Sequence, residues 1–184
     1  MGNREDLLAG ARECLFEKGY ARTTVRDIAT ASGVSMAAIG YHFGSKEALL
    51  TAALGDATRE WGAELEKALE DSADDDAADR FAARWDAVRE SIATNRGLWA
   101  ATFDALSHEE TRAQLAGDTR ESRAGLARLF GSAEDDTTEN GEDARTVGAL
   151  YQALLIGVAA QYLIDPETAP TGTELAEGLR RVQR

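Results

Sequence analysis

Apolar residues recur every three or four positions along most of the chain, which is the spacing of one face of an α-helix. The first such segment covers residues 4–18 and ends at Gly19, a residue type suited to a helix C-terminus. Two short helices are predicted next, over residues 24–32 and 35–43. Each begins with a residue type that caps helix N-termini well, threonine in the first and serine in the second.

Longer helices are predicted over the rest of the chain. Leucine, alanine and tryptophan repeat by fours and threes over residues 46–70. Capping-box patterns at Ser107–Glu110 and Thr171–Glu174 predict two further helix starts. No segment alternates like a strand. Apolar faces predict the remaining helices, around Phe81–Ile92, Leu98–Leu106, Leu115–Phe130, residues 147–164 and Leu175–Val182.

Two polar segments separate these helices. The acidic run Asp71–Asp79 is typical of a solvated helix start, with Ser72 as its cap. Residues 131–141, GSAEDDTTENG, contain two glycines and predict a flexible loop. The predicted fold class is therefore all-α, with short helices at the N-terminus and long ones after it.

Composition agrees with a helical, soluble protein. The chain has 184 residues, of which 43% are hydrophobic and 29% charged, with only two prolines, five phenylalanines and four tyrosines. A single cysteine, Cys14, excludes an internal disulfide framework and a multi-cysteine zinc site. The first residues contain no apolar secretory segment, so we expect a reducing cytoplasmic location.

The net charge of −13 is unevenly distributed. Residues 1–50 contain six basic and six acidic side chains and are neutral overall, so the whole negative excess lies after residue 50. An acidic chain repels nucleic acid, but a neutral module binds it when its basic groups share one face. The charge distribution therefore leaves DNA binding open for the N-terminal quarter.

Residues 24–43 form the strongest motif in the chain. They predict two short helices joined by a tight turn at Gly33, with the small residue Ala29 where the helices cross. Three apolar side chains supply the core between them: Ile28, Val34 and Ile39. A helix before and a long helix after complete a helix-turn-helix, in which the second helix enters the major groove of DNA.

The stretch TTVRDIATASGVSMAAIGYHFGSKEALL resembles the N-terminal domain of the tetracycline-repressor (TetR) family of regulators. The close similarity covers roughly residues 4–54. It implies a homodimeric repressor that binds a double-stranded operator, carries no cofactor, and is released from DNA by a small-molecule effector. It divides the chain into a helix-turn-helix DNA-binding domain, residues 1–45, and a helical ligand-binding and dimerisation domain, residues 46–184.

The resemblance also implies roles in DNA binding. Thr24 and Lys46 would contact phosphates at helix N-termini, with Arg22 and Arg26 as backbone clamps beside them. The recognition helix would present Ser35, Met36, Ala37, Gly40, Tyr41 and His42 to DNA. Packing of Tyr41 against the first helix, and a purely structural role for His42, are the alternatives.

Two residues depart from the family pattern. Met36 stands where a polar or basic residue is common, and Gly40 where a large side chain is common. Residues 35–43 contain no arginine or lysine, so the bidentate contact to guanine is excluded for this helix. We expect apolar contacts to thymine methyl groups, hydrogen bonds from Ser35, Tyr41 or His42, and a contribution from DNA shape.

A ligand cavity between the C-terminal helices is expected to be apolar, and the effector apolar or aromatic. Aromatic residues at helical spacing are also typical of an ordinary core. Tyr151 and Gln152 are the expected polar contacts, because both need partners when buried. The candidate lining residues are Trp85, Val88, Trp99, Phe103, Tyr151, Gln152 and Leu155.

Residues 147–164 contain no charge at all. Eighteen residues approach the length of a membrane span, but Gln152 and Gln161 favour a fully buried helix instead. By the resemblance, this helix and the last one would form a four-helix bundle with a second copy, without a membrane. The candidate interface residues are Ala153, Gly157, Val158, Ala160, Leu175, Leu179 and Val182.

Other classes of function find less support in the sequence. An enzyme is disfavoured because there is no glycine-rich phosphate loop and no nucleophile with a partnered base. The two histidines lie too far apart in sequence to suggest a metal site. The alternative that stays open is a helical small-molecule-binding or interaction protein without specific DNA binding.

Overall fold

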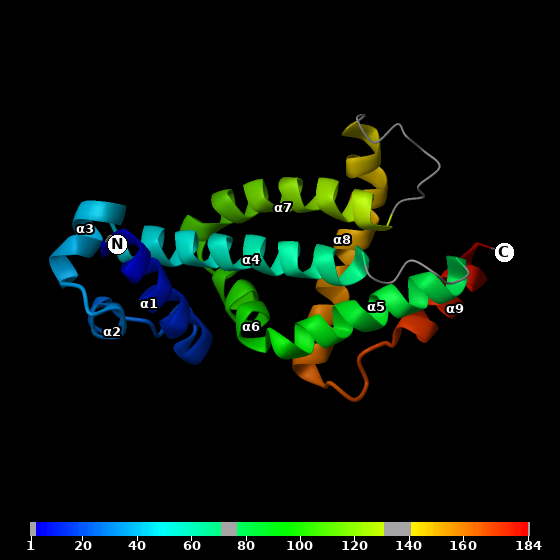
Figure 1. Ribbon diagram of the computed structural model, residues 1–184, viewed down its shortest axis with the longest axis horizontal. Coiled ribbons are helices and arrows are strands. Elements are labelled where there is room, and N and C mark those ends of the chain that lie inside the picture. The colour runs from blue at the N-terminus through cyan, green and yellow to red at the C-terminus, as the bar shows by residue number, and fades with distance from the viewer. Residues whose placement is uncertain (1–2, 71–76, 131–140, 184) are drawn as a thin grey trace. The chain divides into compact units, whose positions relative to one another are not determined.

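The computed structural model describes residues 3–70, 77–130 and 141–183. These residues form nine α-helices and no strand, which confirms the predicted all-α fold class (Figure 1). The helices are α1 (Asn3–Lys18), α2 (Val25–Ser32), α3 (Met36–Phe43), α4 (Lys46–Glu70), α5 (Ala77–Thr94), α6 (Arg96–Ala105), α7 (Glu109–Phe130), α8 (Gly141–Ile164) and α9 (Gly172–Val182).

Most helix boundaries follow the predicted capping residues. Thr24 and Asp27 form a complete capping box at the start of α2, and Thr171 and Glu174 form another at the start of α9. Gly33 has a φ of 68°, which supplies the left-handed turn between α2 and α3. The local sequence therefore determines these ends.

One predicted helix cap is wrong, and two other predicted features are not described by the structure. α7 begins at Glu109, so Ser107 lies in the preceding turn, where its amide donates to the carbonyl of Asp104 at 3.1 Å. The Ser72 helix start and nearly all of the predicted loop at residues 131–141 lie outside the described residues.

The contacts divide the chain into two compact units. The N-terminal unit comprises Met1–Trp61 and Arg96–Asp118, and the C-terminal unit comprises Gly62–Asn95 and Thr119–Arg184. Both α4 and α7 contain a boundary between the units. The predicted division after residue 45 rests on the resemblance and is taken up below as a proposal.

Leucine and isoleucine side chains from α1 to α4 form the core of the N-terminal unit. α1 approaches α2 closely at Gly10, where a Cβ would lie 2.7 Å from the backbone nitrogen of Ser32. Any larger residue would push the two helices apart. The buried side chains are Leu7, Leu15, Ile28, Ile39, Leu49 and Leu50.

α6 also belongs to the N-terminal unit and contacts the end of α1. The Asp104 carboxylate accepts hydrogen bonds from the amides of Tyr20, at 2.7 Å, and Ala21, at 3.3 Å. The Tyr20 ring lies 4.5 Å from that of His108. These contacts fix the segment between α1 and α2 that leads into the helix-turn-helix.

In the C-terminal unit α5 packs against α8 and α9. The amide of Gly172, at the start of α9, donates to the Asp86 carboxylate at 2.8 Å. Arg84 and Arg89 donate to the carbonyls of Leu129 and Pro166 at 2.6 and 2.9 Å. Polar contacts therefore hold the ends of the apolar helices together.

α8 is less buried than the sequence predicts. Leu150, Ile156 and Ile164 are exposed, so one side of this helix is not covered by its own chain. Residues Arg145–Ile164 are long and apolar enough to cross a membrane by length and composition, and 28% of that window is buried. A helix wholly buried within one chain is therefore not what the structure shows.

Candidate nucleic-acid interface

α3 has one buried side and one open side. Ile39 faces the core, whereas Met36, Ala37, Gly40 and Tyr41 are exposed; we call these four residues the α3 outer face. They occupy positions one turn apart on the helix and so share one side of it. Tyr41 is 85% exposed and Met36 53%, which excludes packing of Tyr41 against α1.

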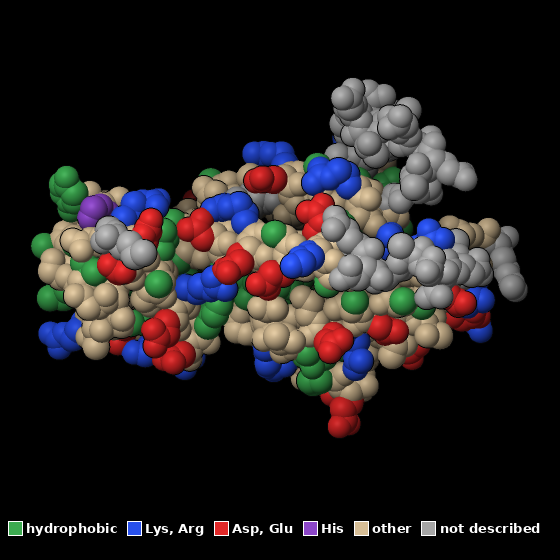
Figure 2. Space-filling model, viewed as in Figure 1, with side chains coloured by type: hydrophobic (Ala, Val, Ile, Leu, Met, Phe, Trp, Pro, Cys, Tyr) green, Lys and Arg blue, Asp and Glu red, His purple; other side chains and the backbone are tan. Residues whose placement is uncertain are grey.

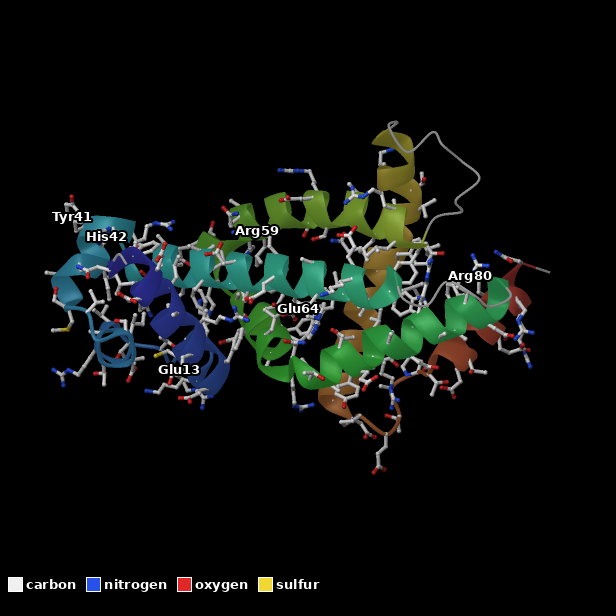
Figure 3. The ribbon with its side chains drawn as sticks, in the orientation of Figure 1. Glu13, Tyr41, His42, Arg59, Glu64 and Arg80 are labelled. Carbon is white, nitrogen blue, oxygen red and sulfur yellow. The ribbon has the colours of Figure 1, made fainter. Side chains whose placement is uncertain are left out.

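The α3 outer face is uncharged, because α3 contains no Lys, Arg, Asp or Glu. Figure 2 shows hydrophobic and histidine side chains over α3. In Figure 3, Tyr41 points outward from α3 with His42 beside it. The two rings meet edge to face at 4.9 Å, and His42 is half-buried. His42 therefore supports Tyr41 at the edge of this face.

Ser35 precedes α3 as its N-cap residue. Its backbone has the extended conformation of a cap, but its hydroxyl makes no capping hydrogen bond. Ser35 is also exposed. Its hydroxyl is thus available to an external acceptor such as a phosphate oxygen.

The hydroxyl of Thr24 is already engaged within the fold. It donates to Asp27 Oδ2 at 2.7 Å and accepts from the Asp27 amide at 3.2 Å. Asp27 Oδ1 in turn accepts from the Lys18 ammonium at 2.6 Å. Thr24 therefore caps α2, and a phosphate contact would compete with Asp27 for the Thr24 hydroxyl.

The basic residues predicted to lie near phosphates differ in how far hydrogen bonds within the fold already engage them. Lys46 donates to the Thr23 carbonyl at 3.0 Å and lies 3.4 Å from the Glu47 carboxylate, so it ties the start of α4 to the start of α2. Arg22 donates through Nε to the Lys18 carbonyl at 2.7 Å. Arg26 is exposed on α2.

The hydrogen bond from Lys18, together with those from Thr24, holds the pKa of Asp27 well below its usual range. A carboxyl group with a lowered folded-state pKa stabilises the fold above its unfolded-state pKa. That contribution disappears as the pH falls through and below the ordinary value of 3.8. We therefore predict that Asp27→Asn lowers the melting temperature near neutral pH, and that the difference from the wild type shrinks in acid.

Thermal melting of both proteins from about pH 7 down to pH 2 measures this effect. Glu64→Gln, on an exposed part of α4, removes the same charge and serves as the control. A difference between wild type and Asp27→Asn that persists unchanged at the lowest pH would contradict the prediction.

The predicted ligand residues fall into both units. In the C-terminal unit, Trp85 stacks on Phe130 with ring centroids 5.3 Å apart, and Phe130 stacks on Tyr151 at 4.8 Å. Val88 and Leu155 are buried in the same unit. Burial raises the pKa of the Tyr151 hydroxyl. The structure thus joins Trp85 and Tyr151 in one aromatic cluster.

Two other ligand candidates, Trp99 and Phe103, lie in the N-terminal unit. Trp99 meets Trp61 edge to face at 5.0 Å, and Phe103 lies 6.4 Å from Trp99. A groove of about 690 Å³ in this unit is lined by charged and small residues of α1, α4 and α7 and by none of the seven ligand candidates.

Gln152 is buried and makes a hydrogen bond at each end of its side-chain amide. Its Oε1 accepts from Arg123 Nε at 2.8 Å, and its Nε2 donates to the Thr119 carbonyl at 3.1 Å. The side chain therefore joins α7 to α8. By contrast, the indole nitrogens of Trp85 and Trp99 are buried without a hydrogen-bond partner.

The dimer candidates divide between exposed and buried positions. Ala153 is exposed, and Gly157 and Ala160 are half-buried on α8. Val158 is only 2% exposed and faces the core of its own unit, so a partner cannot reach it. On α9, Val182 is exposed and Leu175 and Leu179 are half-buried.

Sequence reasoning missed two residues that position α3. Gly10 allows α1 to lie against the end of α2, and Asp104 binds the amides that follow α1. The sequence does not single out Gly10, because glycines occur in helices for several different reasons. Asp104 gave none because its partner Tyr20 is 84 residues away in sequence.

These features define a class of protein. A capped α2, a left-handed turn at Gly33 and a second helix with one buried and one exposed side form a helix-turn-helix, a motif whose second helix reads DNA in many DNA-binding proteins. Residues 7–53 match the family model described as bacterial regulatory proteins, tetR family. By this match residues 7–53 belong to the TetR family, a family of regulatory proteins and not of enzymes.

The chain is similar to known proteins both in sequence, over its matched part, and in structure. The HTH-type transcriptional repressor AcnR of Corynebacterium efficiens is 46% identical over 52 residues, which is 28% of this chain and 28% of AcnR. A putative transcriptional regulator from Pseudomonas aeruginosa has a TM-score of 0.69 with 24% identity, over 98% of this chain and 89% of that one. FadR from Bacillus subtilis, solved in complex with stearoyl-CoA, has a TM-score of 0.68 with 16% identity, over 97% of this chain and 96% of its own.

The sequence match and the structural matches cover different shares of the chain. The match to the curated relative covers 52 residues and spans about a quarter of that protein's length. The likeness to solved structures spans nearly the whole chain at low identity and shows the fold alone.

Proposed function

We propose that this chain is a ligand-responsive transcriptional repressor of the bacterial cytoplasm. It binds a pseudo-palindromic DNA operator as a homodimer and is released by a small apolar or aromatic molecule. The observation that carries the proposal is the exposed α3 outer face within a TetR-type helix-turn-helix. Large apolar side chains on a free surface mark an interaction site, and the family places DNA there.

Specific and non-specific contacts come from different residues in this proposal. The α3 outer face and His42 read the base edges of the major groove, while Ser35 and Thr24 contact phosphates at helix N-termini. Arg22, Arg26 and Lys46 supply the positive charge that phosphates attract. Since Lys46 also bonds Thr23, it would position the helix-turn-helix as well as hold a phosphate.

The functional division proposed is DNA binding by residues 1–45 and ligand binding with dimerisation by residues 46–184. Contacts of α6 with the end of α1 support a role for the second part in positioning the first. Each part then needs the other for regulated binding, because the effector must bind one conformational state better than the other.

Dimerisation through α8 and α9 is supported by the apolar side of α8. Leu150, Ala153, Ile156 and Ile164 are exposed and spaced so that they follow one side of the helix. A second copy would cover this surface, which would otherwise face water or a membrane. Half-buried Gly157 and Ala160 would permit close approach of the partner helix.

We predict that Ala153→Glu yields monomers. The substitution places a carboxylate in the proposed interface without entering the core of its own unit, because Ala153 is exposed. A symmetric interface repeats the charge on both copies, so the repulsion acts twice. Size-exclusion chromatography with light scattering measures the mass in solution.

Ala116→Glu, at an exposed position of α7, is the matched control and should leave the dimer unchanged. An Ala153→Glu protein that stays dimeric at micromolar concentration would argue against the α8 interface. A wild-type protein that is already monomeric would refute it outright.

The aromatic cluster of Trp85, Phe130 and Tyr151 supports an apolar or aromatic effector. FadR, of similar fold, was solved with stearoyl-CoA, a molecule that joins a long apolar acyl chain to a charged CoA group. An effector of this kind should raise the melting temperature of the protein and lower its DNA affinity together.

Selection of genomic DNA fragments by the purified protein tests the proposed function. A dimer with two recognition helices predicts a pseudo-palindrome whose half-sites lie about 34 Å apart, one helical turn of DNA. Recovery of such a site, bound more weakly as salt rises, supports the repressor. Recovery of no fragment from ligand-stripped protein would favour a small-molecule-binding protein without specific DNA binding.

A further inference from the structure

Gly40 occupies an exposed helical position that the fold does not require to be glycine. A Cβ built there meets nothing within 4 Å, and its φ is not positive. The contrast is Gly10, where a Cβ would strike the backbone of Ser32. Glycine inside a helix is less stable than alanine, so the chain keeps at Gly40 a residue that weakens a short helix.

Gly40 lies near the two large apolar side chains of the α3 outer face. Met36 precedes Gly40 by one helical turn, and Tyr41 follows it directly. Both side chains are more than half exposed. Because a Cβ at Gly40 would meet no other atom within 4 Å, the uncharged surface at Gly40 is open to an external group, and we call this open position the notch.

We propose that this notch receives the C5-methyl group of a thymine, with Met36 and Tyr41 covering it from either side. The inference rests on the proposed DNA binding and deepens it by naming the base. In the major groove the thymine methyl is the one apolar group, whereas guanine is read by Arg or Lys and adenine by Asn or Gln. α3 offers none of those four side chains. Its outer face therefore matches thymine best.

Replacing thymine by deoxyuridine in the selected operator tests this inference. Deoxyuridine lacks the methyl group and keeps the pairing and the O4 acceptor. Burial of one methyl contributes about fourfold in affinity, so loss of one contact in each half-site should weaken binding about 15-fold. The positions are found by substituting one symmetric pair of thymines at a time.

Gly40→Ala fills the notch. We expect this variant to bind the thymine operator at least about fivefold more weakly and to lose its preference for thymine over deoxyuridine. Its melting temperature should not fall, because the added methyl meets no atom of the protein. Gly117→Ala, at a helical glycine of α7 with equally open surroundings, should retain both affinity and preference.

The outcomes separate the two levels of the proposal. Failure to select any operator overturns the DNA-binding function and this inference with it. An operator bound equally well with thymine and deoxyuridine overturns only the inference. Retention of the thymine preference by Gly40→Ala does the same, because the methyl contact then lies elsewhere. Capture of a protein partner by the α3 outer face without DNA binding would also overturn it.

Discussion

Replacing Met36 and Tyr41 together by alanine should lower operator affinity about 100-fold for each half-site while the fold stays intact. Each side chain is exposed in the free protein, so its removal leaves no cavity. Burying a large apolar side chain contributes roughly 1.5 kcal/mol or more, and two such losses correspond to about two decades in affinity. Fluorescence anisotropy with the selected operator measures the change.

The matched control is Leu106→Ala, which removes another exposed apolar side chain of the same unit outside α3. It should leave operator affinity within about twofold of the wild type, since it is predicted to lie outside the interface. An unchanged affinity for the double variant would mean that the α3 outer face does not read DNA. Equal melting temperatures of all three proteins would show that the changes act on binding.

Trp85→Ala should lower the free energy of unfolding by about 3–5 kcal/mol, the usual range for loss of a fully buried aromatic side chain. Trp85 is 1% exposed and stacks on Phe130 in the aromatic cluster of the C-terminal unit. Its removal leaves a cavity between α5 and its neighbours that they cannot close without moving. Urea unfolding followed by circular dichroism measures the loss.

Trp85→Phe distinguishes the stability contributed by the aromatic ring from the cost of the buried indole N–H. The indole N–H of Trp85 is buried without a partner, and an unsatisfied donor costs about 1–3 kcal/mol. Phenylalanine keeps an aromatic ring against Phe130 and removes that donor, so its cost should be less than half that of alanine. Equal destabilisation by both variants would contradict this account of the cluster.

The same aromatic cluster connects stability to the proposed effector. An effector carrying a hydrogen-bond acceptor would satisfy the free indole N–H of Trp85. Tyr151, whose pKa is raised by burial, stays a neutral hydroxyl beside it at physiological pH. This arrangement favours neutral or weakly polar aromatic molecules as the first compounds to test.

Local signals in the sequence were sufficient for much of the fold. Thr24 and Thr171 start their helices because a threonine followed three residues later by Asp or Glu satisfies orphan amides wherever it occurs. Gly33 provides the turn for an equally local reason. The absence of Lys, Arg, Asp and Glu from α3 could also be predicted, because it follows from the eight residues of this helix alone.

Long-range packing explains what the sequence could not provide. Val158 is predicted to lie in the interface because residues 147–164 carry no charge on any side of the helix, and only the fold shows that Val158 faces its own core. Gln152 is predicted to contact a ligand because a buried amide needs partners, and only the fold shows that Arg123 and Thr119 supply one at each end of its amide. Such roles depend on partners far away in sequence.

Competition between two DNA duplexes at several salt concentrations tests the central claim, that an uncharged helix confers specific DNA recognition. One duplex is the selected operator and the other a scrambled sequence of the same composition. Affinity for both should fall as salt rises, because the flanking basic residues are proposed to bind phosphates. The preference for the operator should persist, because the α3 outer face contributes no charge. A preference that disappears as salt rises, or never exceeds a fewfold, would contradict the account.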